Sequence, residues 1–368
     1  MKNQKKIGIF CFYNSKGIVC KYVYRLLENI SKVFDSFIIV SNSGLTEESY
    51  RGLKKYCDRI VFRENIGYDA GAYKEILTKI DFSKTEYDEL TLFNDTCYWI
   101  NDNFEDIYNE MREKKYDFWG ITQNDDPRIR RHLQSYFLVF SKKVLNSEIF
   151  VDFWKKLSTE QTNLCAIISD FEIGLTQYLE EKEFTWGSFC GKNDKNIYSD
   201  AFQLISENNC PVIKRKAFFS SSVSKMEVKR IINYIQEHTD YPLEYIKEDL
   251  KVNWGVNDVA ILGKKEPQKE ICRVSLDSIL SQICSYPKIR IYGITVCGLE
   301  LAKAIKDKSI EFVVSDEFYR CKEIKGIKIV PFSKVTEEEN SILIVTLGYD
   351  NCQKLKKNLN WKKVIFYW

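Results

Sequence analysis

Apolar runs alternate with helix-like spacings along the first hundred residues. Four short runs lack the polar alternation of a half-exposed strand, which predicts strands buried on both faces of a parallel sheet. Between them, apolar residues recur every three or four positions, as in helices that cover a sheet. The predicted strands are residues 6–13, 37–40, 59–62 and 90–93. This alternation predicts an α/β fold with a doubly wound, mixed sheet and right-handed crossovers.

The pattern changes twice further along the chain. Residues 223–250 have the spacing of two helices, and the loss of periodicity at residues 253–268 predicts a linker. A second, shorter α/β pattern begins at residue 286. The predicted organisation is an α/β domain over residues 1–222, a helical connector over 223–285 and a smaller Rossmann-like domain over 286–368.

Polar residues and one glycine stand at or just after the ends of all four predicted strands. They are Tyr13 and Asn14, then Asn42, then Asn65, Gly67 and Asp69, and finally Asn94 and Asp95. The carboxyl ends of parallel strands meet at one edge of a doubly wound sheet, which is the usual crevice for a ligand. The connection at residues 63–73 also offers backbone N–H groups and a helix N-terminus, which suit a phosphate. The sequence therefore predicts a nucleotide-phosphate site at this edge.

The two aspartates of this edge each have an alternative role. Asp95 suits a divalent cation, Mg²⁺ or Mn²⁺, that is held mainly by substrate phosphates, but it would otherwise only bond the turn that follows it. Asp69 would either face the ligand or only cap the helix that follows. Their joint placement at strand ends favours the ligand site.

Two stretches further along carry candidate catalytic and sugar-binding groups. Asp170 and Glu172 stand at the start of a predicted helix, where acids are common because of the helix dipole, but either could be a general base for an acceptor hydroxyl. His132, Gln134 and Tyr136 belong to a predicted strand over residues 132–140. They would either pack in the core or line an acceptor or sugar pocket, where polar groups beside aromatic rings bind hydroxyls and ring faces.

Composition narrows the classes of function. The net charge is +3 and both signs are mixed along 368 residues, which argues against a nucleic-acid binder. Twelve Cys form no CxxC pair and only two His are present, which disfavours a zinc site or a catalytic cysteine. The sequence has no recognisable signal peptide and no apolar run of about 20 residues. We therefore expect reduced thiols and a cytoplasmic location, and we make no prediction of oligomeric state.

The C-terminal pattern invites comparison with a dinucleotide site. Gly293 and Gly298 match the outer glycines of G-x-G-x-x-G, and Asp316 follows at the distance of a ribose-binding acid. Thr295 stands where the middle glycine would let a pyrophosphate approach the backbone. We therefore expect no NAD, and a Rossmann-like domain that serves in packing or partner contact.

Several of these motifs resemble known glycosyltransferases. Three motifs of this chain resemble those in the nucleotide-sugar half of inverting GT-A enzymes. They are Phe12-Tyr13-Asn14, Glu64-Asn65-Ile66-Gly67 and Leu92-Phe93-Asn94-Asp95-Thr96. More specifically, residues 63–71, 92–95, 132–137 and 171–175 resemble the rhamnan synthesis protein F family. The resemblance covers roughly residues 5–220 and departs from the commoner GT-A pattern at Asn42, where an acid is usual, and at Asn94-Asp95, which replaces D-x-D.

The resemblance implies transfer of a sugar from a nucleotide-sugar donor, typically dTDP-rhamnose or else a UDP- or GDP-sugar. The acceptor would be a cell-surface polysaccharide or a lipid-linked glycan, reached by peripheral contact at the inner membrane face. Carried over by position, Asn14, Asn65 and Asp69 face the nucleotide. Asp95 takes the place of the metal-binding aspartate, and Glu172 or Asp170 that of the base. Either a cation at Asp95 or the helix N-terminus after Asp69 would stabilise the departing diphosphate.

Two hypotheses from other classes stay open at this stage. The chain could be a non-catalytic α/β scaffold of a polysaccharide-assembly complex, with the C-terminal domain for docking. It could also be an oxidoreductase that uses the C-terminal domain. Substitution of Asp95 and Glu172 separates the enzyme from the scaffold, and bound cofactor absorbance would reveal the oxidoreductase.

Overall fold

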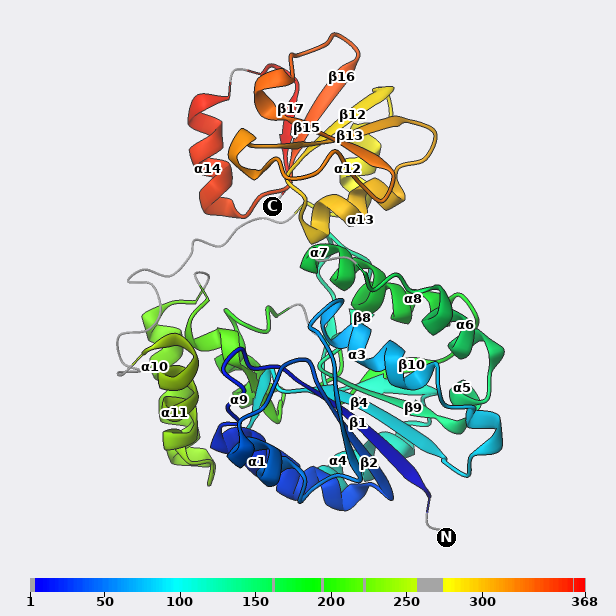
Figure 1. The fold of residues 1–368 in the computed structure, drawn as a ribbon. Coiled ribbons are helices and arrows are strands. Elements are labelled where there is room, and N and C mark those ends of the chain that lie inside the picture. Colours follow the sequence, from blue (N-terminus) through cyan, green and yellow to red (C-terminus); the bar gives the residue numbers. More distant parts are fainter. Residues whose placement is uncertain are drawn as a thin grey trace. The chain divides into compact units, whose positions relative to one another are not determined.

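The computed structural model divides the chain into two units (Figure 1). Unit 1 comprises Met1–Asp125 and His132–Lys269, and unit 2 comprises Asp126–Arg131 and Glu270–Trp368. The structure describes residues 4–160, 163–192, 195–220, 223–256, 274–359 and 361–367. Most of the predicted linker at residues 253–268 lies outside these described residues.

A seven-stranded mixed sheet forms the centre of unit 1, in the order β10-β6-β9-β4-β1-β2-β3. Its strands are β1 (Lys6–Phe12), β2 (Ser36–Ser41), β3 (Arg59–Phe62), β4 (Glu89–Asn94), β6 (Phe118–Gly120), β9 (Phe137–Ser141) and β10 (Trp186–Ser188). The strands β1 to β4 are mutually parallel, and β9 runs antiparallel to both β4 and β6. The predicted α/β fold with a mixed sheet is confirmed, and each of the four predicted N-terminal strands agrees within one residue at either end.

Both faces of this sheet are buried, as the unbroken apolar runs predict. Successive strand residues point to opposite faces, so Phe10 and Phe12 join one hydrophobic cluster while Ile7 and Ile9 join the other. In Figure 1, α3, α6 and α8 cover one face and α1 and α4 cover the other. These helices of unit 1, with the shorter α2, α5 and α7, are α1 (Lys21–Ile30), α2 (Glu47–Leu53), α3 (Tyr68–Leu77), α4 (Phe104–Lys114), α5 (Lys142–Leu145), α6 (Glu148–Lys156), α7 (Leu164–Ile167) and α8 (Gly174–Glu180).

The strand predicted at residues 132–140 is wrong in one respect, because it is split in two. Its first part, β8 (His132–Leu133), pairs with β7 (Gln123–Asn124) in a separate two-stranded sheet, and the second part is β9. Between them, the backbone N–H of Ser135 donates to the Glu172 carboxylate (2.8 Å) instead of to a neighbouring strand. A side chain from a distant helical segment thus interrupts the strand.

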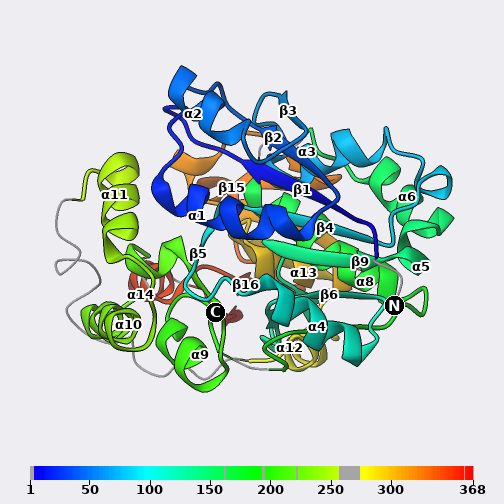
Figure 2. The same cartoon turned by 90° about the horizontal axis from the view of Figure 1, so that it is seen from below.

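The predicted helical connector does not form a separate part. Helices α10 (Lys225–His238) and α11 (Leu243–Trp254) belong to unit 1, whereas α12 (Leu276–Gln282) belongs to unit 2. The apolar faces of α10 and α11 are buried in the hydrophobic cluster that also holds Phe10 and Phe12. Figure 2 shows α11 beside α1 and close to α10. The remaining elements here are α9 (Ala201–Glu207) and a two-stranded antiparallel sheet of β5 (Cys97–Trp99) and β11 (Val212–Lys214).

Unit 2 contains a six-stranded sheet in the order β14-β15-β13-β12-β16-β17. All its pairings are parallel except that of β14 with β15. By chain position the five parallel strands run 3-2-1-4-5, which is the order of the first five strands of a Rossmann sheet. Its elements are β12 (Lys288–Tyr292), α13 (Val296–Ala304), β13 (Ser309–Val314), β14 (Glu323–Ile324), β15 (Ile327–Pro331), β16 (Ser341–Val345), α14 (Tyr349–Asn358) and β17 (Val364–Phe366).

The short segment Asp126–Arg131 is anchored within unit 2. Arg130 Nε forms an ion pair with Glu300 (2.9 Å), whose side chain is fully buried. The Arg128 carbonyl accepts a hydrogen bond from the Tyr367 hydroxyl (2.6 Å). None of the helices in the described ranges combines the length and apolar character that a bilayer crossing requires.

Candidate functional site

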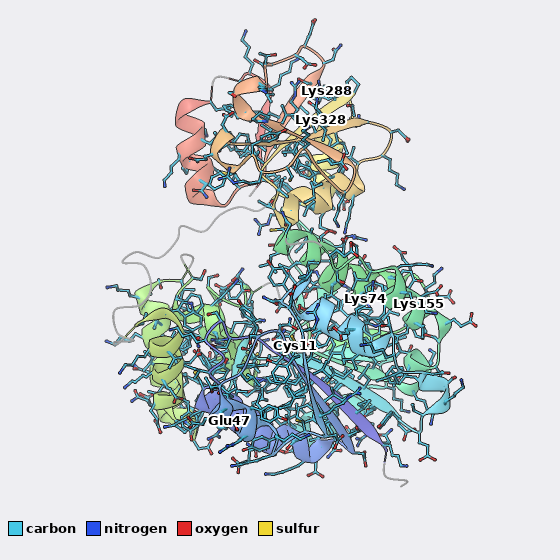
Figure 3. All side chains as sticks on the ribbon, viewed as in Figure 1. Cys11, Glu47, Lys74, Lys155, Lys288 and Lys328 are labelled. Carbon is cyan, nitrogen blue, oxygen red and sulfur yellow. The ribbon has the colours of Figure 1, made fainter. Side chains whose placement is uncertain are left out.

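The strand ends of unit 1 bring the predicted ligand residues to one edge of the sheet. Register pairs Cys11 of β1 with Asn94 of β4, and Phe12 of β1 with Ser41 of β2. Cys11, labelled in Figure 3, is buried at this end of β1. The residues that follow β1, β2, β3 and β4 are therefore neighbours, as the carboxyl edge of parallel strands requires.

The connection from β3 to α3 has a strained backbone. Gly67 (φ 72°) and Tyr68 (φ 54°) both adopt the left-handed region. A Cβ on Gly67 would lie 2.3 Å from the Thr159 carbonyl oxygen, so a side chain does not fit there. A non-glycine residue in this region costs about 1–3 kcal/mol, and such strain clusters at ligand sites. The turn thus places the first N–H groups of α3 at the edge of the sheet.

Asn42 and Asn65 hold this turn in place. The Asn42 amide nitrogen donates to Asn65 Oδ1 (3.0 Å) and to the Tyr68 carbonyl (2.8 Å). Its oxygen accepts from Arg63 Nη1 (3.0 Å), and Arg63 Nη2 donates to the Ile66 carbonyl (2.7 Å). The contacts seen for Asn42 are therefore positional, and the predicted nucleotide contacts of Asn42 and Asn65 stay predictions.

A continuous set of hydrogen bonds, here called the Asp69 chain, crosses the edge from α3 to β11. It consists of Asp69, Asn94, Thr96 and Lys214. Asn94 Nδ2 donates to Asp69 Oδ2 (2.9 Å), while Asn94 Oδ1 accepts from Thr96 Oγ1 (2.6 Å). Lys214 Nζ then donates to Thr96 Oγ1 (2.8 Å). The Ala70 N–H donates to Asp69 Oδ1 (2.9 Å), so both oxygens of this carboxylate are oriented.

The Asp69 carboxyl has an unusual proton affinity for an aspartate. Burial raises the pKa of Asp69 to about 6, because loss of solvation outweighs the hydrogen bond from Asn94, and the negative charge of Glu172 adds to the rise. The same neighbourhood acts in the opposite direction on Lys214. Burial alone would lower its pKa, but nearby groups that include Glu172 and Asp69 raise it above the usual value. The site therefore contains an ammonium and carboxylates that respond to one another.

A second group of charged side chains, the Arg215 cluster, lies behind the Asn94–Thr96 turn. It consists of Arg215, Asp95, Asp249, Tyr22 and Tyr98. Arg215 donates from Nε to Asp249 Oδ2 (2.9 Å) and from Nη2 to Asp249 Oδ1 (2.8 Å), a bidentate pair. Its Nη1 donates to Asp95 Oδ2 (3.2 Å). Tyr98 donates to Asp249 (2.5 Å), and the Tyr22 hydroxyl donates to the Asp95 carbonyl (2.9 Å).

Aromatic rings and an amide complete the surroundings of this cluster. The Arg215 guanidinium lies 5.1 Å from the Tyr22 ring centroid and 4.8 Å from that of Trp254. Asn253 donates to Asp249 Oδ1 (2.6 Å) and accepts from Asn14 Nδ2 (2.7 Å). The strand end at Asn14 is thereby tied to the end of α11. Burial raises the pKa of Asp95 to about 6, although Arg215 opposes the rise.

Sequence reasoning did not identify Lys214, Arg215, Asp249 or Asn253 as members of the site. The hydrogen bonds of Arg215 with Asp95 and of Asn253 with Asn14 join residues 120 and 239 positions apart. Their local surroundings are a three-residue strand and a helix that had been predicted as a connector. Three consecutive basic residues, Lys214, Arg215 and Lys216, directly follow the apolar run at residues 211–213, and this is the signal that could have found Lys214 and Arg215.

Glu172 lies on a π-helical segment, Ile168–Ile173, between α7 and α8. The prediction that Asp170 and Glu172 open a helix is wrong, because the helical turns already begin at Leu164. Glu172 Oε2 accepts from the Ser135 N–H (2.8 Å) and hydroxyl (2.6 Å). Its Oε1 lies 3.6 Å from His132 Nε2, and His132 is buried. A π-helical turn in mid-helix is frequent at functional sites.

The pKa of Glu172 differs strongly from that of Asp69. Burial would raise the pKa of Glu172, but the neighbouring His132 side chain and the two bonds from Ser135 lower it to about 2. Two carboxyl groups whose environments separate their pKa values are typical of sites that use acids in different roles. Glu172 is therefore deprotonated throughout the range near neutral pH, whereas Asp69 takes up a proton as the pH falls through about 6.

The other predicted residues have varied positions. Tyr136 is buried, bonds its hydroxyl to Thr122 (2.7 Å) and presents its ring to Lys214 Nζ at 4.4 Å. Gln134 is half-buried and its side-chain oxygen accepts from Thr122 (2.7 Å). Tyr13 is 44 % exposed beyond β1, and Asp170 is half-buried on the π-helical segment. Their predicted ligand contacts stay predictions.

The surroundings of Asp95 do not fit a divalent cation in this arrangement. The Arg215 guanidinium donates to Asp95 Oδ2, and a doubly charged ion beside this guanidinium would be repelled by it. Within the described ranges, no three or more His, Cys, Asp and Glu side chains are grouped as metal ligands. The physical reason for this difference from the predicted metal role is a basic side chain that arrives from β11.

Comparison with known proteins adds information on the family. A family model described as rhamnan synthesis protein F matches residues 37–272, more than half of the chain. The match includes α10 and α11, in agreement with their place in unit 1. An uncharacterized protein of Sinorhizobium fredii, y4gN, is 28% identical over 192 residues, which cover 51% of this chain and 49% of that protein. Virulence protein VirA of Vibrio anguillarum is 30% identical over 190 residues, covering 49% and 58%. The chain thus spans about half the length of the curated relatives it matches.

Solved structures are more remote. A 4-diphosphocytidyl-2C-methyl-D-erythritol synthase from Anaerococcus prevotii is 13% identical, with a TM-score of 0.33, over 53% of this chain and 92% of that one. Core-mannan synthase A from Aspergillus fumigatus, in its Mn/GDP form, is 9% identical with a TM-score of 0.28, over 52% and 75%. TM-scores this low do not establish a shared fold or function.

Proposed function

The chain belongs to the rhamnan synthesis protein F family, and from this premise we propose that unit 1 is an inverting glycosyltransferase that uses a nucleotide-sugar donor. The observation that carries the proposal is the carboxyl edge of β1 to β4. There the strained β3–α3 turn and the Asp69 chain hold backbone N–H groups and an ammonium at the strand edge, and the deprotonated Glu172 carboxylate is near enough to act on Asp69 and Lys214 electrostatically. This set of groups matches the requirements of a sugar diphosphate and an acceptor hydroxyl.

The donor is proposed to lie with its diphosphate at the N-terminus of α3. The N-terminal N–H groups of a helix favour anions, and the left-handed residues Gly67 and Tyr68 turn this end toward the strand edge. Asn14, Asn65 and Asp69 are proposed to face the nucleotide, as the family resemblance implies. We propose dTDP-rhamnose, or else a UDP- or GDP-sugar, as the donor.

The reaction is a single displacement at the anomeric carbon. The acceptor oxygen bonds to that carbon while the bond from the carbon to the diphosphate oxygen breaks through an oxocarbenium-like state. The electron pair of the broken bond leaves with the nucleoside diphosphate, and the acceptor proton passes to Glu172. Inversion follows because attack and departure occur on opposite faces of the sugar.

Glu172 suits the role of base because it is deprotonated and held in a fixed orientation. With a pKa of about 2 it is deprotonated, and Ser135 and His132 hold its orientation. It is a weak base, which suffices for a hydroxyl that becomes acidic as its oxygen bonds to the sugar cation. Asp170, on the same π-helical segment, is the second candidate. His132, Gln134 and Tyr136 are proposed to form or support the acceptor side.

The acceptor is proposed to be a growing cell-surface polysaccharide or a lipid-linked glycan. A cytoplasmic protein would reach a lipid-linked acceptor by peripheral contact at the inner membrane face. Both proposals rest on the family and on no contact within the structure.

Ligand-induced stabilisation tests the donor. Thermal unfolding is measured with dTDP, UDP, GDP, CMP and NAD, each with Mg²⁺, with Mn²⁺ and with EDTA. A ligand at about 100 times its dissociation constant adds about 2.7 kcal/mol of stability, which a melting curve resolves. We expect one nucleoside diphosphate to stabilise the chain and NAD to leave it unchanged. Stabilisation by none of them would favour the non-catalytic scaffold, and stabilisation by NAD alone would favour the oxidoreductase.

A further inference from the structure

Lys214 and Arg215 are fixed by backbone pairing against the turn that carries Asp95. In the β5–β11 pair, Lys214 is opposite Cys97, and the Arg215 N–H donates to the Thr96 carbonyl (3.0 Å). Two adjacent cations therefore lie against the turn that carries Asp95, the aspartate predicted to bind a metal. Their side chains have different surroundings: Arg215 is paired with carboxylates, whereas Lys214 bonds to a hydroxyl.

Arg215 is committed to carboxylates of the protein itself. It forms a bidentate pair with Asp249, whose side chain is fully buried, and a further bond to Asp95, whose side chain is 8% exposed. Its guanidinium also lies over the rings of Tyr22 and Trp254. Removing a buried, hydrogen-bonded ion pair of this kind is costly, so Arg215 keeps Asp95 occupied.

Lys214 has no such partner. Within the part of the chain that the structure describes, no carboxylate oxygen lies within 4.0 Å of its Nζ, which donates to Thr96 Oγ1 (2.8 Å) and faces the Tyr136 ring (4.4 Å). An ammonium has three N–H donors, and a half-buried one is costly without an anion. Asp69, at the other end of the Asp69 chain, marks the start of α3, where the diphosphate is proposed to lie.

We propose that Lys214 binds the diphosphate of the donor and offsets the charge of the departing nucleoside diphosphate, while Arg215 occupies Asp95, so that the transfer needs no divalent cation. This inference rests on the proposed function. When the bond between the anomeric carbon and the diphosphate oxygen breaks, its electron pair adds one negative charge to the phosphate. The Lys214 ammonium stabilises that charge as an ion pair and transfers no proton. The proton of the acceptor hydroxyl goes to Glu172.

The test is calorimetric titration of the full chain with the nucleoside diphosphate that stabilises it and with the matching monophosphate, in EDTA and in Mg²⁺ or Mn²⁺. We expect the wild-type affinity for the diphosphate in EDTA to be within about twofold of that with metal. Lys214→Met should weaken diphosphate binding by about tenfold to a hundredfold, since a charge-assisted bond is lost, and should change monophosphate binding much less. Lys214→Arg should retain most of the affinity.

Lys216→Met is the matched control, because Lys216 is an exposed lysine two positions along the same segment and should bind as the wild type does. The inference would be overturned if the wild type bound the diphosphate only with metal, or if Lys214→Met bound it as tightly as the wild type does. Either outcome would leave the proposed transferase intact. The comparison of wild type in EDTA and in metal holds even where a variant fails to fold. Absence of nucleoside diphosphate binding under all conditions would instead overturn the proposed function itself, and the inference with it.

Discussion

Two parallel sheets in this chain share a strand order but end in different chemistry. In unit 1 the parallel strands run β3-β2-β1-β4, and in unit 2 β15-β13-β12-β16, which is the order 3-2-1-4 in both. The carboxyl edge of unit 1 carries Asp69, Asp95, Lys214 and Arg215, with shifted pKa values. The same edge of unit 2 carries Thr295, Thr346 and Asp316, which bond within that unit, and the ion pair of Arg128 with Asp126 lies near Cys297 at the start of α13.

The contacts of the unit 2 edge explain the difference. Thr346 Oγ1 donates toward the carbonyls of Tyr292 (3.2 Å) and Gly293 (3.0 Å). Thr295, at the position of the missing glycine, accepts from the Gly298 N–H (3.0 Å) and so caps α13. Asp316 accepts from the Ser333 N–H (3.2 Å) and hydroxyl (2.5 Å). Polar groups at the unit 2 edge thus bond to one another and to the backbone, whereas two carboxyl groups at the unit 1 edge have pKa values raised to about 6. Topology alone therefore does not assign chemistry.

Glu172→Gln should have the largest effect of the substitutions considered, and it tests whether the strand edge of unit 1 is catalytic. Loss of the general base should lower kcat for donor consumption by about a hundredfold to ten-thousandfold, with nucleoside diphosphate binding retained. A coupled assay for the released nucleoside diphosphate measures the rate. Glu181→Gln, at an exposed position just beyond α8, is the control. Equal rates for Glu172→Gln and wild type would remove the edge of unit 1 from catalysis.

Arg215→Met should cause the next largest change, in stability. It leaves Asp95 and Asp249 buried without their cation, which costs about 3–5 kcal/mol. Urea unfolding followed by tryptophan fluorescence measures the loss, and hydrogen exchange shows whether it is confined to unit 1. Arg51→Met removes an exposed pair with Glu47 and should cost less than about 1 kcal/mol. Similar losses in the two variants would contradict the role assigned to the Arg215 cluster.

The pH dependence of stability should also separate the two units. Asp69 has a folded pKa of about 6, above the ordinary value of about 3.9, so the folded state is favoured while this carboxyl is protonated. Stability from this group is complete below about pH 4 and is lost as pH rises through about 6, an effect of about 3 kcal/mol. Asp69→Asn should therefore reduce the fall in stability of unit 1 between pH 4 and 7, and the part that remains is due to Asp95, whose pKa is also raised to about 6.

Glu172 has the opposite sign but acts in a lower window. Its pKa of about 2 contributes stability that is present above about pH 4.5 and is lost as pH falls through 2. It therefore leaves the range from pH 4 to 7 almost unaffected. Urea titrations of wild type and Asp69→Asn at several pH values check the prediction, and identical slopes would refute it.

Asp316→Asn should have the smallest effect on stability and on activity, because unit 2 is not expected to take part in the reaction. Its bonds to Ser333 are exposed, so the substitution should change stability by no more than about 0.5 kcal/mol. Donor consumption should stay at the wild-type rate. A loss of activity similar to that of Glu172→Gln would show that unit 2 also carries chemistry.

The fold of unit 1 was readable where neighbours in sequence determine it. The strands β1, β2 and β4 are buried on both faces, β3 is a partly exposed edge strand, and all four apolar runs end near Asn, Gly and Asp residues that also form the turns. The same turns marked Asp69, Asn94 and Asp95, because parallel strands must present their carboxyl ends together. The division at residues 222 and 285 was less accurate, since the amphipathic faces of α10 and α11 do not show which core buries them.

The amino-acid sequence by itself determined the alternation of strands and helices, the strand-end edge and the family. Only the tertiary structure decided which charges meet there. Lys214, Arg215 and Asp249 reach the edge through a three-residue strand and a helix far along the chain. Hydrophobic periodicity reflects burial, which is a local property of each element, whereas ion pairing depends on distances between elements that folding alone establishes. For this reason Asp95 resembled a metal ligand in the sequence and is paired with a guanidinium in the structure.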